Sequence, residues 1–181
     1  MRFLVASVIL ACCSVTADAS QWTWKLEPFA ASCEEAAGPK LDKDGNMLEG
    51  EHDFVLHKCK TKYGPTMWLL YQDSARMSVG FGEAPTVTWT GASLERGNWP
   101  IEWGGVEVNG KFEVKTATVR FRWLGNDTPV SGLLIYKING DQPACAVSSA
   151  DSNERARQLA AAIKADTKCE REIEKLDELV K

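Results

Sequence analysis

The sequence predicts an α+β fold: a mainly antiparallel β-sheet of about six to seven strands, followed by C-terminal helices packed on one face. Three observations support this prediction. Short apolar or alternating runs, separated by turn-forming residues, fill the chain from residue 20 to residue 150. The hydrophobic period becomes helical over residues 152–181. Four widely spaced cysteines between residues 33 and 169 suit a framework of two disulfides.

The N-terminus has the pattern of a secretory signal peptide. A basic Arg2 precedes an almost entirely apolar run over residues 3–13, and an A-x-A site at residues 17–19 precedes Ser20. We therefore expect cleavage after residue 19 and removal of the signal peptide, residues 1–19.

The expected mature chain, residues 20–181, has a length that suits a single domain. No apolar run reaches the roughly 20 residues of a membrane-spanning helix, so we expect no transmembrane segment. An alternative interpretation makes Cys12 the acylated residue of a lipoprotein, although the signal would then be very short. We expect a periplasmic or secreted protein.

The charge pattern argues against two classes of partner. The formal net charge is −4 at pH 7, and the basic residues are scattered along the sequence. Nucleic acids and anionic membranes bind clustered basic residues. We expect neither of them as a partner.

Four cysteines follow the expected cleavage site, and an even number in an oxidising compartment indicates structural disulfides. A strand starting at Cys145 runs out roughly 17 Å and a helix over residues 152–167 returns roughly 22 Å, which brings Cys169 level with Cys145. Of the three possible pairings, this geometry favours Cys145 with Cys169, and hence Cys33 with Cys59. The sequence has no C-x-x-C motif, so we do not expect a redox catalyst.

Most strands are predicted from their apolar pattern. Residues 22–26 alternate, as a strand with one buried face does, and residues 52–59 form a second candidate strand. Residues 67–71 and 133–138 are apolar on both faces, as expected of covered central strands. Residues 76–81 are expected to form a hairpin with the run before them.

The run from Lys111 to Trp123 contains a break in phase. Its apolar residues occupy even positions as far as Val114 and odd positions from Ala117 onward. One extra residue at 115–116, a β-bulge, would keep both sets in the core.

The C-terminal part has a helical period after a capping-box-like start at Asp151 and Glu154. Two apolar stripes predict two helices, formed by Ala156, Leu159, Ala160 and Ile163, and by Ile173, Leu176, Leu179 and Val180.

Several short motifs occur in a recognisable order. Besides the two cysteine pairs, they are Tyr63-Gly64-Pro65, Ser78-Val79-Gly80-Phe81-Gly82, Ile101-Glu102-Trp103, Ala117-Thr118-Val119-Arg120-Phe121 and Asn153-Glu154-Arg155-Ala156-Arg157. In this order they resemble a family of short exported alphaproteobacterial proteins of unknown function, over most of the mature chain. The resemblance implies export and two cysteine pairs, and it assigns no catalytic residue. Between Ala36 and Glu51 the chain departs from the family and looks like an insertion.

The insertion-like stretch contains part of a calcium-loop pattern. Asp42, Asp44 and Asn46 occupy alternate positions, as oxygen ligands do in such loops. The sixth position is Met47 instead of Gly, and the twelfth is Asp53 instead of Glu. A simple hairpin explains the stretch without a metal, so we expect no cofactor and keep the first three residues as a weak calcium candidate.

Three tryptophans mark the candidate binding surface. Trp89, Trp99 and Trp103 lie in or beside a Gly- and Pro-containing segment typical of loops, where binding residues concentrate. An exposed indole can anchor a protein partner or stack on a sugar ring. Local packing is the alternative explanation.

The sequence contains no G-x-S-x-G, H-E-x-x-H or P-loop motif, and no catalytic residue is assigned. We expect a non-enzymatic binding or interaction module whose partner is a protein or a component of the cell envelope. The alternatives are a small periplasmic hydrolase and a structural envelope protein without a defined ligand.

Overall fold

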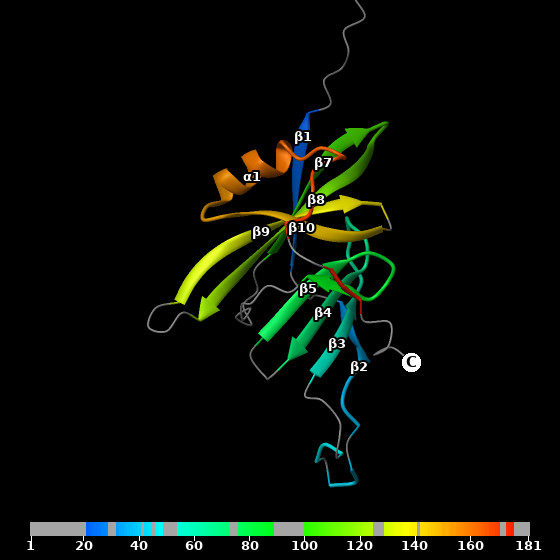
Figure 1. Ribbon diagram of the computed structural model, residues 1–181. Helices are drawn as coiled ribbons and strands as arrows, with labels where there is room; N and C mark the ends of the chain where they lie inside the picture. The colour runs from blue at the N-terminus through cyan, green and yellow to red at the C-terminus, as the bar shows by residue number, and fades with distance from the viewer. Residues whose placement is uncertain are drawn as a thin grey trace, which may run out of the picture.

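The computed structural model describes residues 21–28, 32–40, 42–44, 46–48, 54–72, 76–88, 100–124, 129–140, 142–170 and 173–175. This part of the chain forms two antiparallel sheets and one short helix (Figure 1). The antiparallel α+β character agrees with the prediction. The number of strands exceeds the six to seven expected, because several short strands pair only through contacts distant in sequence.

The first sheet, called sheet A, has the strand order β1-β7-β8-β9-β10. Its strands are β1 (Trp22–Pro28), β7 (Pro100–Val108), β8 (Lys111–Leu124), β9 (Pro129–Asn139) and β10 (Gln142–Ala150). Between β7 and β8, Asn109 and Gly110 have φ angles of 51° and 74°. Two successive positive φ angles define a tight hairpin turn that matches the twist of the strands.

The second sheet, sheet B, has the strand order β11-β6-β5-β4-β3-β2. Its strands are β2 (Cys33–Ala37), β3 (Phe54–Cys59), β4 (Met67–Gln72), β5 (Arg76–Phe81), β6 (Thr86–Thr88) and β11 (Ile173–Lys175). The pairing of β4 with β5 confirms the predicted hairpin.

Side chains from both sheets form one shared core. Phe81 of β5 contacts Trp103 of β7 and Tyr136 of β9 edge to face, with ring centroids 5.4 and 5.2 Å apart. The two predicted covered strands, β4 and β9, are buried on both faces over residues 67–70 and 132–136. Their continuous apolar runs therefore reflect contacts on each side of the sheet.

The predicted β-bulge is present in β8. Gly104 pairs with Thr116 and Gly105 pairs with Val114, so Lys115 is the extra residue. The apolar residues on either side of the bulge consequently pack in or against the same core, namely Phe112, Val114, Ala117, Val119 and Phe121.

The only helix in the described part of the chain is α1 (Asn153–Ala161), which lies on the outer face of sheet A (Figure 1). Its cap is Ser152, whose Oγ accepts a hydrogen bond from the Arg155 N–H at 3.3 Å. The helix is shorter than the predicted residues 152–167. The next segment is irregular, and Lys137 Nζ donates to the carbonyls of Ala165 and Thr167 there.

The predicted second helix is wrong at its start, because residues 173–175 form β11 and pair with β6. A short apolar stripe is a weak helix signal, and pairing with a strand edge outweighs it. The expected covering of one face by helices is therefore reduced to α1, and residues 176–181 lie outside the described part.

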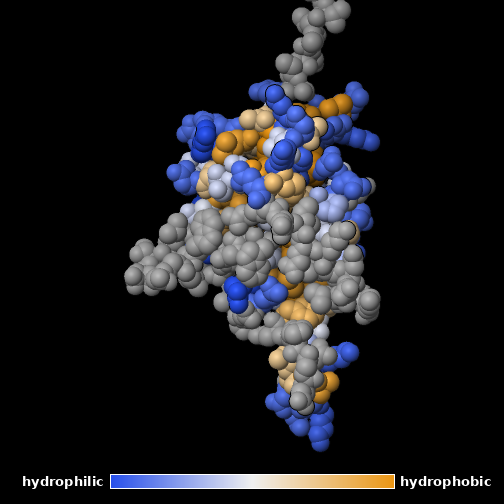
Figure 2. All heavy atoms as spheres, in the orientation of Figure 1, coloured by the Kyte–Doolittle hydropathy of each residue, from blue (hydrophilic) through white to orange (hydrophobic). Residues whose placement is uncertain are grey.

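The segment between β2 and β3 projects from sheet B (Figure 1). The Leu48 N–H donates to the Lys40 carbonyl at 3.0 Å, which pairs the two arms of the segment. Met47 and Leu48 are 45% and 44% exposed, and hydrophobic and hydrophilic surfaces meet at this projection (Figure 2).

Both favoured disulfides are present. Cys33 and Cys59 lie opposite each other on β2 and β3. The bond between Cys145 and Cys169 fastens the segment after α1 to β10. The pairing is as predicted, but the return from β10 to Cys169 is made by α1 together with the irregular residues 162–168, because the helix is shorter than expected.

Replacing Cys145 and Cys169 together by Ala should lower the free energy of unfolding by about 3 kcal/mol, because the unfolded chain gains the freedom of an open loop. Urea denaturation of the oxidised proteins measures the change. The Cys33→Ala, Cys59→Ala variant provides the comparison, since the two disulfides span similar separations of 26 and 24 residues. Unchanged stability would show that the bond does not constrain the fold.

Candidate functional site

The predicted surface formed by Trp89, Trp99 and Trp103 is wrong for Trp103. Its side chain is 0% exposed in the core between the sheets. The indole N–H donates to Glu27 Oε2 at 2.7 Å, and a Cβ on Gly64 would lie 2.3 Å from Trp103 Cζ3. Trp103 therefore has a structural role, while Trp89 and Trp99 lie outside the described residues.

The three weak calcium candidates form a turn. Asp42 Oδ1 accepts hydrogen bonds from the backbone N–H groups of Asp44 and Asn46 at 2.8 and 2.9 Å. Asn46 Nδ2 donates to Asp42 Oδ2 at 3.2 Å. Within the described residues, no group of three or more His, Cys, Asp or Glu side chains could hold a metal ion. A hydrogen-bonded Asx turn explains the spacing of these residues.

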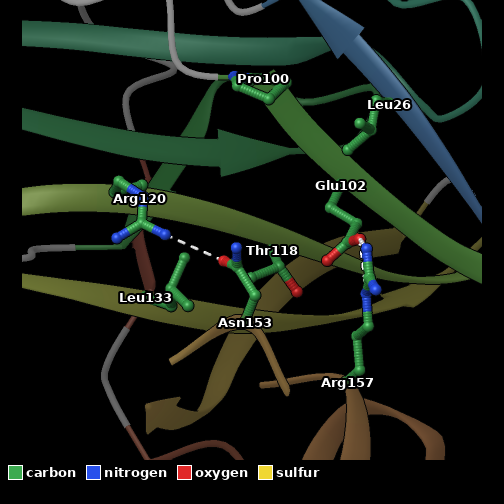
Figure 3. A pocket seen from close by; sticks show the side chains of 8 residues that line it. All are labelled: Leu26, Pro100, Glu102, Thr118, Arg120, Leu133, Asn153 and Arg157. Atoms are coloured by element: carbon green, nitrogen blue, oxygen red, sulfur yellow. Dashed lines mark hydrogen bonds and ion pairs between the residues drawn. The ribbon is translucent and has the colours of Figure 1, made fainter. Parts of the chain in front are cut away.

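A pocket of about 240 Å³ opens on the outer face of sheet A, next to α1 (Figure 3). Strands β1, β7, β8 and β9 and helix α1 all contribute to its lining, which consists of Leu26, Pro100, Glu102, Thr118, Arg120, Leu133, Asn153 and Arg157. None of these residues is predicted from the sequence to form a site, although several belong to the motifs on which the family resemblance depends.

Strand register explains why these side chains share one face. Glu102 lies opposite both Leu26 and Thr118, and Arg120 lies opposite Leu133. Directly opposed residues on antiparallel strands point to the same side of a sheet. The two lining residues of α1 are four positions apart, so these also share one helix face.

An ion pair between the buried Glu102 and the exposed Arg157 forms one wall of the pocket. Glu102 is 7% exposed, and its Oε1 accepts hydrogen bonds from Arg157 Nε at 2.8 Å and from Arg157 Nη2. The hydrogen bond to Glu102 raises the pKa of Arg157, while burial acts in the opposite direction. The guanidinium also lies 5.7 Å from the ring centroid of Trp24. These contacts fix Arg157 over the sheet.

A second guanidinium lies across the pocket. Arg120 Nη1 donates to Ser131 Oγ at 3.1 Å, and Arg120 Nη2 donates to Asn153 Oδ1 at 2.9 Å. Two arginines and one glutamate line the pocket, so the lining carries a net charge of +1. An anionic group is therefore favoured over a cationic one.

The floor of the pocket contains a buried hydroxyl. Thr118 is 3% exposed, and its Oγ1 has no hydrogen-bond partner in the described part of the chain. A buried hydroxyl without a partner costs about 1–3 kcal/mol. Leu26, Pro100 and Leu133 supply apolar surface around it. The arrangement suits a small ligand with both polar and apolar parts.

Replacing Thr118 by Val should raise the free energy of unfolding by about 1 kcal/mol, because the variant keeps the branched shape and removes an unpaired hydroxyl. Thr116→Val should raise the free energy of unfolding by a similar amount, since Thr116 Oγ1 is also buried without a partner in the described residues. Thr86→Val is the matched control, because Thr86 Oγ1 donates to the Ala84 carbonyl at 3.4 Å. Urea denaturation measures all three. A stability loss at Thr118 equal to that at Thr86 would contradict the assignment.

Comparison with known proteins assigns the chain to no family. No family model, curated protein or solved structure matches the chain. The resemblance to exported alphaproteobacterial proteins thus stays a prediction. None of the described helices is long and apolar enough to cross a membrane.

Proposed function

We propose that this protein is an exported, disulfide-bonded binding module and that the pocket on sheet A holds its ligand. The observation that carries this proposal is the convergence of polar groups in one small space. The Glu102–Arg157 pair, the Arg120 guanidinium and the Thr118 hydroxyl, which has no partner among the described residues, meet there beside apolar side chains. Binding pockets typically combine a few placed polar groups with an apolar lining.

The contacts of Glu102 favour binding over hydrolysis. Its Oε1 accepts two hydrogen bonds from Arg157, so this oxygen is already engaged by the wall of the pocket. The described lining residues include no Ser, Cys or His that could act as its partner in catalysis. A small hydrolase is therefore the weaker alternative.

Two features support export. The apolar leader with its A-x-A site at residues 17–19 is typical of a cleaved signal peptide. The disulfides Cys33–Cys59 and Cys145–Cys169 are of the structural kind that persists in oxidising compartments. Both features suit a protein that meets its ligand outside the cytoplasm.

Expression of the full chain with a C-terminal tag in a Gram-negative host should give a periplasmic protein that begins at Ser20. Mass spectrometry should find a mass four hydrogens below that of the fully reduced chain, because two disulfides form. An uncleaved cytoplasmic product with free thiols would contradict export. A lipid on Cys12 would replace the proposed cleavage with the lipoprotein alternative.

The pocket should bind small fragments in preference to the rest of the surface. Nuclear magnetic resonance of the processed, isotope-labelled protein with a library of small organic fragments should shift the signals of Glu102, Thr118, Arg120 and Arg157. Signals of the projecting turn at Asp42 and Asp44 should stay in place and serve as the internal control. Hits that cluster outside the pocket, or no hits at all, would contradict the assigned site.

A further inference from the structure

We propose that the ligand is a small organic acid with a hydrogen-bond donor near its carboxylate, in the manner of an amino acid or a hydroxy acid with a short apolar side chain. This inference rests on the proposed function and adds the chemical class of the ligand. The inference is based on the two ends of the pocket, which differ in hydrogen-bonding character.

One end suits a carboxylate. The Arg120 guanidinium is held in place by hydrogen bonds to Ser131 Oγ and Asn153 Oδ1, and its positive charge attracts a carboxylate. Because Asn153 accepts from Arg120 through Oδ1, its amide nitrogen is left to donate, and Figure 3 shows this nitrogen directed into the pocket. Asn153 also begins α1, and helix N-termini favour negative charge.

The other end requires a donor. Arg157 engages one carboxylate oxygen of Glu102, and Figure 3 shows the second oxygen directed away from Arg157, toward Thr118. A carboxylate oxygen only accepts hydrogen bonds. An ammonium or hydroxyl group of the ligand would therefore satisfy it, and the same group could give the buried Thr118 hydroxyl a partner. Glu102 and Thr118 lie on opposed positions of β7 and β8, so a single group can serve both.

The remaining wall and the size limit the rest of the ligand. Leu26, Pro100 and Leu133 offer an apolar surface that suits a short hydrocarbon chain. The volume of about 240 Å³ is below the roughly 300–1,000 Å³ of sites for drug-sized molecules. A ligand of the size of a single amino acid is consistent with this space, whether it is a free acid or the C-terminal residue of a peptide.

Four compounds with the same branched hydrocarbon frame separate these contributions. Leucine has a carboxylate and an ammonium, leucic acid a carboxylate and a hydroxyl, isocaproic acid a carboxylate alone, and isoamylamine an ammonium alone. Isothermal titration of the processed protein should show leucine or leucic acid binding about tenfold or more tightly than both single-group compounds, because each charged hydrogen bond contributes about that factor. The dipeptide alanyl-leucine tests whether the ligand is a free acid or the C-terminal residue of a peptide. If the dipeptide binds as tightly as leucic acid, the ligand is a peptide C-terminus. If the dipeptide does not bind, the ligand is a free acid.

Single substitutions test the role of each end of the pocket. Arg120→Gln should weaken binding of the tightest compound about tenfold or more, because it removes the charge that meets the carboxylate. Arg122→Gln is the matched control with the same loss of charge on β8 outside the pocket lining, and should leave binding unchanged. Thr118→Val should weaken binding about fivefold. Thr116→Val, which changes a similar hydroxyl outside the lining, should have no effect.

Several outcomes would overturn the proposed ligand class. Isocaproic acid that binds as tightly as leucine and leucic acid would exclude the donor requirement, and tight binding of isoamylamine would exclude the carboxylate requirement. Equal binding by Arg120→Gln and Arg122→Gln would remove Arg120 from the site. If fragments shift the pocket signals but none of the acids binds, the class is wrong and the binding function stands. If no compound shifts these signals, both proposals fail.

Discussion

The buried carboxylate of Glu27 joins the two sheets, and the geometry of the pocket depends on this contact. Its two oxygens accept hydrogen bonds from the Trp103 indole N–H and from the Lys62 backbone N–H, each at 2.7 Å. Strands β1 and β7 of sheet A are thereby fastened to the turn between β3 and β4 of sheet B. Gly64 in this turn has no side chain, so the backbone can lie against the Trp103 ring. Glu102 precedes Trp103 on the opposite face of β7, so the core contact that fixes the tryptophan also fixes the pocket carboxylate.

The docking of α1 brings the remaining polar groups to this face. Ala156 and Ala160 are fully buried against β9 and β10, and their small side chains allow the helix to approach the sheet closely. This approach places Asn153 and Arg157 within hydrogen-bonding distance of Arg120 and Glu102. The pocket is therefore a product of helix packing as much as of strand register.

Much of the framework could be predicted from the sequence because it depends on local pattern and chain length. The reversal of parity around Lys115 predicted the bulge, and the spacing from Cys145 to Cys169 predicted their pairing. Local patterns could not predict which distant segments pair with each other. Residues 173–175 illustrate this, because they form β11 only by pairing with β6. For Trp103 a useful signal was present: Ile101 and Trp103 alternate as inward-facing residues, although the neighbouring glycines suggested a loop. The pocket had no comparable signal, because five elements each contribute one or two residues and the burial of the Thr118 hydroxyl exists only in the folded chain.

The position of Arg157 above Trp24 has a consequence for observing the protein in solution. The guanidinium that lines the pocket also lies 5.7 Å from the Trp24 ring centroid, and Trp24 stacks on Trp22 at 5.6 Å. Indole emission responds to the electric field of a nearby charge, and this cation is shared between the fluorophore and the pocket wall. A ligand of the proposed kind would change the field around Arg157, so we expect the emission of Trp24 to shift when the pocket is filled.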